Sequence, residues 1–439
     1  MDSIIYEIDN FINYISVVGI SKLLRIFWFF FFFEMFRYVV IDFVSLAFIK
    51  VGRILNKDKR EAAIKHLYNE SPLVSIIVPG KNEGKHIFKL VTSLKEQTYP
   101  HYELIIVDDG SDDDTELICT GLKKNGLIDQ FIRNEVRGGK ASGANTALRA
   151  SKGKYIVHLD ADCSYDRDAI EQILIPFYLD KRVGAVGGNV MVRNYKESLA
   201  TTLQAFEYVD AISIGRMVAS HLGIYRVISG AFGAFRKDLL NRVEGWDVGP
   251  GLDGDITVKL RKMGCKIIFE DRAVCLTNAP STFQKLVNQR LRWDKSLIRF
   301  RLRKHRDVFF PDNNFKLIDF VSFAENIFYS LILNLKWYVY FVDMLFNYVD
   351  LIWFIIMMNV FLYTLSNYFK LLIFNFFREK THAPFSYFLL FMPLMVFYHG
   401  YFLRLVRTVA YIKEVFFKSS YEDVWNPSKS SKFAKEMGI

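Results

Sequence analysis

The sequence predicts an α/β domain that faces water and is inserted between membrane-spanning helices. Of its 439 residues, 51% are hydrophobic and 16% are aromatic, which is high for a soluble protein. The apolar residues gather in Leu23–Ile49 and in Leu317–Phe417, whereas residues 50–306 have the mixed composition of a soluble domain. Within that middle part, apolar stretches that end abruptly in polar residues alternate with helical patterns. This order predicts a parallel, doubly wound, Rossmann-like sheet.

Composition divides the chain and limits its partners. We expect an N-terminal membrane segment (1–50), the α/β domain (51–280), an interface helix (281–316), C-terminal transmembrane helices (317–418) and a polar tail (419–439). The net charge is +10, and many basic residues flank the apolar segments, as expected beside an anionic inner leaflet. Nucleic acid is the rival partner, but no recognition module is visible, so we predict no nucleic-acid binding. Four scattered cysteines without a C-x-x-C pair indicate neither a zinc site nor a disulfide framework, as in a reducing cytoplasm.

The first apolar stretch, Leu23–Ile49, is long enough for one membrane span of about 20 residues. It carries Glu34, Arg37 and Asp42, each of which costs roughly 2.5–3.5 kcal/mol at the centre of a bilayer. Glu34 and Arg37 are three residues apart and share one helix face, so we expect them to pair with other protein rather than face lipid. By the positive-inside rule, the basic residues that follow place the α/β domain in the cytoplasm: Lys50, Arg53, Lys57, Lys59 and Arg60.

Three predicted strands, Leu73–Pro79, Tyr102–Val107 and Tyr155–Leu159, each end in polar side chains. In open α/β sheets, ligands lie at the carboxyl ends of the strands. The third strand ends in Asp160-Ala161-Asp162, and one or both carboxylates can reach a hard cation such as Mg2+. Taken alone, a D-x-D sequence is more often a solvated turn. The glycine-rich turn around Lys140, whose backbone amides can approach phosphate, is also a weak signal by itself.

Together these motifs resemble the nucleotide-sugar-binding half of inverting family 2 glycosyltransferases, which have the GT-A fold. The resemblance rests on the order and spacing of Pro79–Glu83, Asp108-Asp109-Gly110, Gly139-Lys140 and Asp160-Ala161-Asp162. It implies that Asp108 and Asp109 hold uridine, and that Asp162 and Asp160 bind Mg2+ or Mn2+ together with the donor diphosphate. The remaining residues of the expected donor-binding set are Pro79, Asn82, Glu83 and Lys140.

The second half of the domain carries a candidate catalytic base. Val183–Arg193 and Val227–Arg236 are apolar and glycine-rich, as strands lining a substrate pocket would be, which makes Ser229 and Gly230 candidate acceptor-binding residues. Asp253 precedes a helix that starts near Asp255, at the position where the family keeps the base that deprotonates the acceptor hydroxyl. Leu252 departs from the family, which usually has an acidic residue there. Asp255 by itself is typical of a helix start or cap.

Gln289, Arg292 and Trp293 form the most specific motif. On a helix these positions, i, i+3 and i+4, share one face. They match the Q-x-x-R-W signature of processive synthases such as cellulose, chitin and hyaluronan synthase. The resemblance implies that Gln289 and Arg292 contact the donor pyrophosphate and that Trp293 stacks on the terminal sugar. The alternative is an amphipathic helix on the membrane surface, with the indole at the interface and the arginine on lipid phosphate.

Two helices, Leu199–Val218 and Phe283–Leu302, mix apolar residues with charges and are predicted to lie on the membrane surface. The basic run that follows the second helix is interpreted as an anchor on anionic lipid, with RNA binding as the alternative: Arg299, Arg301, Arg303, Lys304, His305 and Arg306. Three C-terminal spans are then predicted: Ile318–Met344, Leu351–Leu372 and Phe385–Leu403. Three crossings would put the tail outside, although its basic residues favour the inside, so the topology stays open.

The sequence thus predicts a multi-pass protein of the plasma (inner) membrane with a cytoplasmic catalytic domain. We expect it to polymerise a nucleotide-activated sugar, foremost a UDP-sugar, into a β-linked extracellular polysaccharide and to pass the polymer across the membrane. The expected partners are the donor, the growing polysaccharide, the lipid bilayer and an export or regulatory protein. One rival is a transferase that adds a single sugar to a membrane lipid carrier, and another is an inactive sugar-binding subunit. The Gln289–Trp293 motif argues against the first, and Asp162 and Asp253 argue against the second.

Overall fold

The computed structural model describes residues 26–247, 251–310, 315–377, 382–422 and 427–437, together with Tyr6, Asp9 and Asn13. The predicted N-terminal membrane segment therefore lies partly outside the described residues. The chain forms two compact units. The helical unit comprises Met1–Lys50 and Glu325–Leu405, and the α/β unit comprises Val51–Ala324 and Val406–Ile439.

The α/β unit is built on one eight-stranded sheet with the order β3-β2-β1-β4-β7-β6-β8-β5. The first four strands along the chain run parallel to one another, which confirms the predicted arrangement for that half. The second half is mixed, because β7 runs antiparallel to β4 and β6 while β6 and β8 are parallel. The strands are β1 (Val74–Gly80), β2 (Tyr102–Asp108), β3 (Gln130–Arg133), β4 (Tyr155–Leu159), β5 (Ser164–Tyr165), β6 (Val183–Val192), β7 (Phe232–Arg236) and β8 (Lys266–Thr277).

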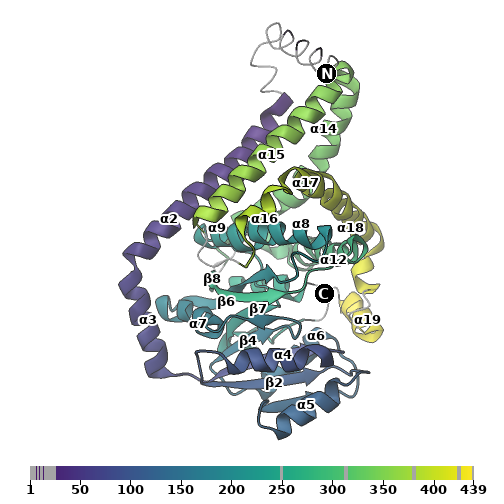
Figure 1. Cartoon of the computed structure of the whole chain (residues 1–439). Helices are drawn as coiled ribbons and strands as arrows, with labels where there is room; N and C mark the ends of the chain where they lie inside the picture. Colours follow the sequence, from purple (N-terminus) through teal and green to yellow (C-terminus); the bar gives the residue numbers. More distant parts are fainter. Residues whose placement is uncertain are drawn as a thin grey trace. The chain divides into compact units, whose positions relative to one another are not determined.

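Helices packed on the sheet bury its central strands along nearly their whole length, as expected for parallel strands rich in Val and Ile. One helix comes especially close, because a Cβ added to Gly143 would lie only 3.0 Å from Cβ of Pro79 in β1. Figure 1 shows α3 beside α7, in agreement with their contacts. The helices of this half are α3 (Lys57–Glu70), α4 (Gly84–Lys95), α5 (Thr115–Lys124), α6 (Lys140–Ala150) and α7 (Ala169–Leu179).

The helices predicted to lie on a membrane surface begin at capping residues. Ser198 forms a capping box with Thr201 at the start of the first, and the Thr282 side chain accepts a hydrogen bond from the Lys285 N–H at the start of the second. Each is then interrupted by a π-helical stretch. The elements are α8 (Leu199–Glu207), η2 (Tyr208–Ile214), α9 (Gly215–His221), α10 (Lys237–Arg242), α11 (Leu252–Lys262), α12 (Phe283–Ser296), η3 (Leu297–Lys304), η4 (Arg306–Phe309) and α13 (Leu317–Ile327).

The basic run in η3 is not the lipid anchor that the sequence suggested. Arg299, Arg301 and His305 are buried, with only 1%, 7% and 4% of their surfaces exposed. Arg303 donates a hydrogen bond to the buried carboxylate of Glu414 at 2.9 Å. Apart from the exposed Arg306, the basic residues of this run are therefore buried or engaged within the chain. Sequence inspection missed this because Glu414 is more than 100 residues away. The C-terminal elements are α18 (Leu403–Phe417), η8 (Ser419–Glu422) and α19 (Ser428–Met437).

In the helical unit, α15 lies along η1 and also packs on α17 (Figure 1). The pairing predicted for the charged face of the first apolar stretch is confirmed. Glu34 accepts hydrogen bonds from Lys370 and, at 3.1 Å, from Ser366, and Arg37 pairs with Asp42 at 2.8 Å. The elements are η1 (Phe30–Ile41), α2 (Asp42–Leu55), η5 (Phe328–Ile332), α14 (Leu333–Asn347), η6 (Val349–Leu351), α15 (Ile352–Phe377), α16 (Phe385–Leu389), α17 (Met392–Phe397) and η7 (Tyr398–Phe402).

Among the described residues, two helices are long and apolar enough to cross a membrane, Leu317–Asn347 and Val349–Phe377. They coincide with two of the three predicted C-terminal spans. The third, Phe385–Leu403, is not one continuous α-helix, because α16 ends at Leu389 and α17 begins at Met392 with a proline in its first turn. Residues 406–439 belong to the α/β unit. If the chain crossed the membrane an even number of times between the α/β domain and this tail, both would lie on the same side. The tail would then be inside, as its basic residues favour.

Candidate active site

The D-x-D carboxylates follow β4, where Asp160 meets a lysine from the glycine-rich turn. Lys140 is the first residue of α6, and its ammonium donates a hydrogen bond to Asp160 Oδ1 at 2.5 Å. Gly139, immediately before it, has a φ of 90°, a conformation that favours glycine and lets the chain turn into the helix. Tyr165 supports the loop, since its hydroxyl donates to the backbone carbonyl of Asp160 at 3.3 Å. The sheet and α6 thus bring these two predicted donor-binding residues together.

Glu83 and Asp162 form an acidic cluster with Asp160. Burial, together with the negative charges of Asp162 and Asp160, raises the pKa of Glu83 to about 7. Burial also raises the pKa of Asp162, with the charge of Asp160 acting in the same direction. Carboxylates that raise one another's pKa hold negative charge in excess of what the chain neutralises, which is a setting that a divalent cation stabilises.

The donor set fits a hard cation that is shared with a substrate. Mg2+ typically takes one or two carboxylates from a protein and fills its shell with phosphate oxygens and water. Across the described residues, no three His, Cys, Asp or Glu side chains surround one metal position. Asp160 is already paired with Lys140, so the oxygens of Asp162 are the more available ligands.

Asp108 and Asp109, the predicted uridine-binding pair, are both hydrogen-bonded within the chain. Asp108 accepts from the Ser111 N–H at 2.9 Å. Asp109 accepts from the backbone N–H groups of Gly138 and Gly139 at 2.9 and 2.6 Å. Asp109 therefore ties the glycine-rich turn that carries Lys140 to the end of β2. Whether either carboxylate also meets a nucleoside stays a prediction.

The loop after β1 is held in the same way. Asn82 has a φ of 59°, donates its N–H to Ser111 Oγ at 2.8 Å and accepts from the Asp112 N–H at 2.9 Å. Asparagine tolerates this left-handed conformation better than most residues. Pro79 lies just before the loop and pairs with Val107 in the sheet. The residues predicted to bind the donor thus lie on two neighbouring loops that brace each other.

Asp253, the predicted base, lies in the first turn of α11. Its Oδ2 accepts from the Gly230 N–H at 2.7 Å, and a Cβ on Gly230 would lie 2.5 Å from Asp253 Oδ1, so glycine is what permits the approach. The Ser229 carbonyl accepts from the Phe232 N–H at 3.1 Å and closes the turn that presents Gly230. Burial raises the pKa of Asp253, while Lys140 and the hydrogen bond from Gly230 oppose that rise. A buried carboxylate with a raised pKa suits a general base.

Lys140 joins the two sets of carboxylates electrostatically. Burial would lower the pKa of its ammonium, but the charges of Asp160, Asp253 and Asp162 outweigh burial and raise it. The Lys140 ammonium, which pairs with Asp160, is thus also influenced by the charges of Asp162 and of the predicted base.

The Q-x-x-R-W motif lies on α12, as predicted. Gln289 Oε1 is buried without a hydrogen-bond partner in the part of the chain that the structure describes. Trp293 is 38% exposed, and the guanidinium of Arg290 lies 4.5 Å from the centre of its ring. Arg290 is itself held by Glu207 of α8 through both of its terminal nitrogens, at 2.8 and 2.9 Å. Arg292 is half-buried.

The helix that carries this motif packs against the start of α11. A Cβ on Gly251, the residue before α11, would lie 2.7 Å from Ser296 Cβ and 2.8 Å from a ring carbon of Phe300. Ser296 in turn donates to the carbonyl of Trp293 at 2.5 Å. The close approach of α12 and η3 to Gly251 brings the motif to the same region as Asp253.

Sequence reasoning missed three residues of this region. Arg290 lies inside the motif, and its i, i+3 spacing to Trp293 was the available signal for their stacking. His158 of β4 donates from Nδ1 to the Gly230 carbonyl at 2.6 Å, and burial lowers its pKa to about 4, so it is neutral at physiological pH. Arg216 of α9 has its Nη1 atom buried with no hydrogen-bond partner among the described residues. No pattern in the sequence marked the last two.

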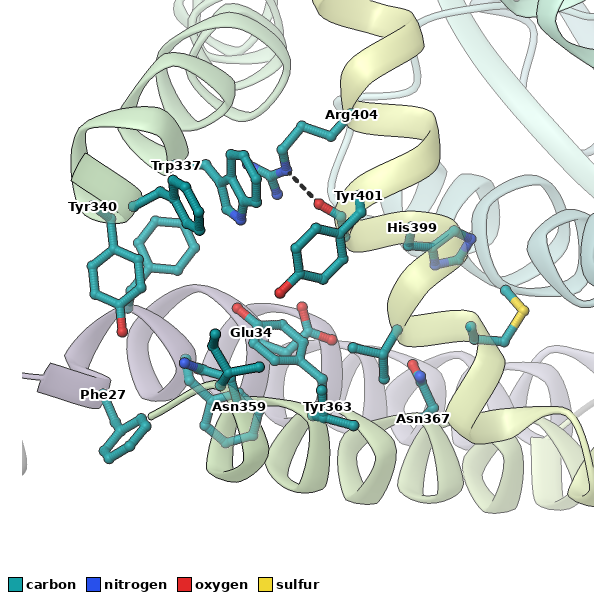
Figure 2. Close-up of a pocket in the computed structure, with 18 of the residues that line it drawn as sticks. Phe27, Glu34, Trp337, Tyr340, Asn359, Tyr363, Asn367, His399, Tyr401 and Arg404 are labelled. Carbon is teal, nitrogen blue, oxygen red and sulfur yellow. Dashed lines mark hydrogen bonds between the residues drawn. The ribbon is translucent and has the colours of Figure 1, made fainter. Parts of the chain in front are cut away.

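A separate cavity of about 160 Å³ lies within the helical unit (Figure 2). Aromatic side chains surround it, and Figure 2 shows Trp337, Tyr363 and Tyr401 facing the cavity together with the carboxylate of Glu34. The remaining polar lining residues include Asn359, Asn367, Lys370, His399 and Arg404.

The mixed sheet with a D-x-D sequence after β4 defines a GT-A glycosyltransferase fold. The chain is similar to the solved mannosyltransferase PcManGT from Pyrobaculum calidifontis in complex with GDP-Man and Mn2+, with a TM-score of 0.54, 18% identity and coverage of 83% of this chain and 97% of that one. Residues 75–243 match the model of glycosyl transferase family 2. The chain therefore contains a family 2 glycosyltransferase domain, as its motifs predicted.

Curated relatives extend the likeness. The chain is 32% identical over 258 residues to poly-beta-1,6-N-acetyl-D-glucosamine synthase of Staphylococcus epidermidis. The matched stretch covers 58% of this chain and 61% of the relative. The same-named protein of Staphylococcus aureus is 32% identical over 262 residues, with 57% and 62% covered. The matched stretch thus spans about three fifths of the length of these relatives.

Proposed function

We propose that this chain is an inverting, processive glycosyltransferase that polymerises a UDP-activated sugar into a β-linked polysaccharide. The observation that carries the proposal is the ion pair of Asp160 with Lys140, whose ammonium also feels the charges of Asp162 and Asp253, together with the packing of α12 and η3 against Gly251 at the start of α11. Glycosyl transfer needs cationic or metal-binding groups at a diphosphate and a base at the acceptor hydroxyl. This cluster supplies both.

In the transfer step, Asp253 takes the proton of the acceptor hydroxyl while that oxygen forms a bond to the anomeric carbon. The bond from this carbon to the diphosphate breaks on the opposite face, so an α-linked donor gives a β-linkage. General base catalysis of this kind contributes roughly 10²–10⁴ in rate. Lys140 and Arg292 are the cationic side chains that we assign to the charge of the leaving diphosphate.

A divalent cation fits the acidic cluster, with Asp162 as the first ligand and Asp160 as the second. Bound there, Mg2+ or Mn2+ would neutralise diphosphate charge. The raised pKa values of Glu83 and Asp162 support this assignment, because a cation would relieve the repulsion among these carboxylates.

For the donor, we propose UDP-N-acetylglucosamine first, because the curated relatives are named as synthases of poly-beta-1,6-N-acetyl-D-glucosamine. For the acceptor, we assign stacking of the terminal sugar to Trp293. Arg290 covers one part of the indole and is anchored on Glu207, so the ring is held in place while 38% of its residue surface stays exposed. A fixed aromatic plane is a suitable platform for the apolar face of a pyranose.

We also propose that the helical unit lies in a lipid bilayer. The exposed apolar side chains of α15 recur every three or four residues from Trp353 to Phe376, a distance of about 35 Å along a helix, which compares with a hydrocarbon core of about 30 Å. The pairing of Glu34 with Lys370 removes the main objection to placing this unit in lipid. Its cavity combines aromatic rings with amide and charged groups (Figure 2), a chemistry that suits passage of a polysaccharide.

The test uses the purified full-length chain in lipid nanodiscs with Mn2+ or Mg2+ and individual UDP-sugars or pairs of them. UDP release is measured together with product length and linkage. Long β-linked products would support the proposal. Single transfer to an added polyprenyl phosphate would instead identify the rival transferase, and no UDP release with any sugar would overturn both.

A further inference from the structure

Two aspartates of α11 face different surroundings. Asp253 meets Gly230, whereas Asp255, only 1% exposed, turns to the residues that end η3. It lies 2.7 Å from His305 Nε2 and accepts from the Lys304 ammonium at 2.9 Å. Side chains two residues apart on a helix point about 200° apart. One short segment therefore presents one carboxylate to Gly230 and the other to η3. Asp255 lies in the first turn of α11, as predicted for a helix-start carboxylate, but the residue at the cap position is Gly251.

The hydrogen bonds define the charge state of this cluster. The ammonium of Lys262 lies 2.9 Å from His305 Nδ1 and can only donate, so Nδ1 accepts and the ring proton sits on Nε2, facing Asp255. His305 is thus neutral, in keeping with the burial that lowers its pKa. Burial opposes ionisation of Asp255, but the hydrogen bond from His305 and the charge of Lys304 prevail and lower its pKa to about 2.

The same η3 is held on a second side by the C-terminal residues. Arg303 donates to the side chain of Glu414 at 2.9 Å and to its backbone carbonyl at 3.2 Å. The guanidinium of the fully buried Arg299 lies 4.3 Å from the centre of the Tyr421 ring. Because η3 continues directly from α12, these contacts leave the helix of the Q-x-x-R-W motif little freedom to move.

We propose that Asp255, His305 and Lys304 are positioning residues that set the distance between the base on α11 and the Q-x-x-R-W motif on α12. This inference rests on the proposed function. Without the cluster, both helices still form, but Asp253 shifts relative to the sugar that stacks on Trp293. A misplacement of about 1 Å costs roughly 100-fold in rate. Donor binding suffers less, because Asp160, Asp162 and Lys140 are held by β4 and α6.

The first variant is Asp255→Asn, which removes the charge and keeps the size. In the full-length chain with UDP-N-acetylglucosamine and Mn2+, we expect kcat to fall about 10- to 100-fold, while KM for the donor changes less than about threefold. The matched control is Asp238→Asn, which breaks an exposed 2.8 Å ion pair with Arg236 and is expected to leave both constants unchanged.

A second pair of variants separates positioning from general loss of structure. His305→Gln retains an amide donor and should recover part of the kcat that His305→Leu loses. Asp255→Asn combined with His305→Leu should be little worse than either variant alone, since the two residues act through one contact. If Asp255→Asn does not fold, Lys304→Gln tests the same cluster by removing the ammonium that donates to Asp255.

Wild-type kcat in folded Asp255→Asn and His305→Leu would overturn the positioning role. So would a loss of donor affinity as large as the loss of kcat, since that indicates a collapsed site. A wild-type chain that releases no UDP from any sugar would refute the proposed function itself, an outcome that the variants cannot mimic.

Discussion

The loops at the strand ends and the helices opposite them satisfy their polar groups differently. In the loops, Asp109 accepts two backbone N–H groups and Asn82 is bonded to the next loop at both its N–H and its side-chain oxygen. On the helices, Gln289 Oε1 is buried without a hydrogen-bond partner in the described part of the chain. A buried unsatisfied polar group costs roughly 1–3 kcal/mol. These two loop residues therefore make their hydrogen bonds within the chain, whereas Gln289 carries a cost that a bound ligand would offset.

The largest expected effect separates chemistry from binding. Asp253→Asn removes the base and should lower turnover about 10²- to 10⁴-fold, while UDP binding stays within about twofold. UDP release and calorimetric titration with UDP and Mn2+ measure the two quantities. The Asn side chain keeps an oxygen for the Gly230 N–H, so the fold should survive. Unchanged turnover would remove Asp253 from the mechanism.

The next effect tests the acidic cluster. Asp162→Asn should weaken binding of UDP in the presence of Mn2+ by about 100-fold, because the assigned metal loses a charged ligand. Binding measured over a series of Mn2+ concentrations reports the loss. Asp166→Asn, four residues further along the chain, is the comparison variant and should keep the wild-type Mn2+ dependence. Equal Mn2+ dependence in Asp162→Asn and wild type would contradict the assignment.

On the loop side, the expected effect is on stability. In Asp109→Asn, an amide group must face one of the two backbone N–H donors, so the free energy of unfolding should fall by about 2 kcal/mol. Denaturant or thermal unfolding of the variant checks this. The exposed Asp112→Asn serves as its control and should change stability by less than about 0.5 kcal/mol. A variant as stable as wild type would show that the turn does not depend on Asp109.

On the helix side, Trp293→Ala should spare donor binding and shorten the product. Removal of the stacking plane costs the terminal sugar about 1 kcal/mol or more, which lowers acceptor affinity several-fold. Product length by gel filtration and UDP affinity are compared with those of Trp293→Phe, which keeps an aromatic face. Products of normal length from the alanine variant would refute the stacking role.

The smallest effect is a shift in a pH profile. Lys140 lowers the pKa of Asp253, so Lys140→Met should raise that pKa further. The base is active when deprotonated, so the acidic limb of kcat/KM should move to higher pH. Arg149→Met, on the exposed end of the same helix, is the reference. A limb that stays in place would show that Lys140 does not tune the base.

Much of the site could be predicted because its motifs follow strand or helix boundaries. Asp160, Lys140 and Asp253 lie near strand ends or helix starts, and the topology of an α/β sheet brings such positions together. The contacts of Asp255 and Arg303 could not be predicted, because their partners His305 and Glu414 are 50 and 111 residues away. The misread basic run has the same cause, since a charge pattern does not reveal whether its partner is lipid or a distant carboxylate.

By itself, the sequence determined the division into apolar ends and an α/β middle part, the parallel half of the sheet and the order of the motifs. It could do so because hydrophobic periodicity and turn residues act locally. Only the tertiary structure decided which charges are buried together. Burial made Glu83 and Asp253 harder to ionise, whereas the hydrogen bond from His305 and the charge of Lys304 outweighed burial and held Asp255 as an anion. The same surroundings distinguish two aspartates that stand two residues apart in the chain.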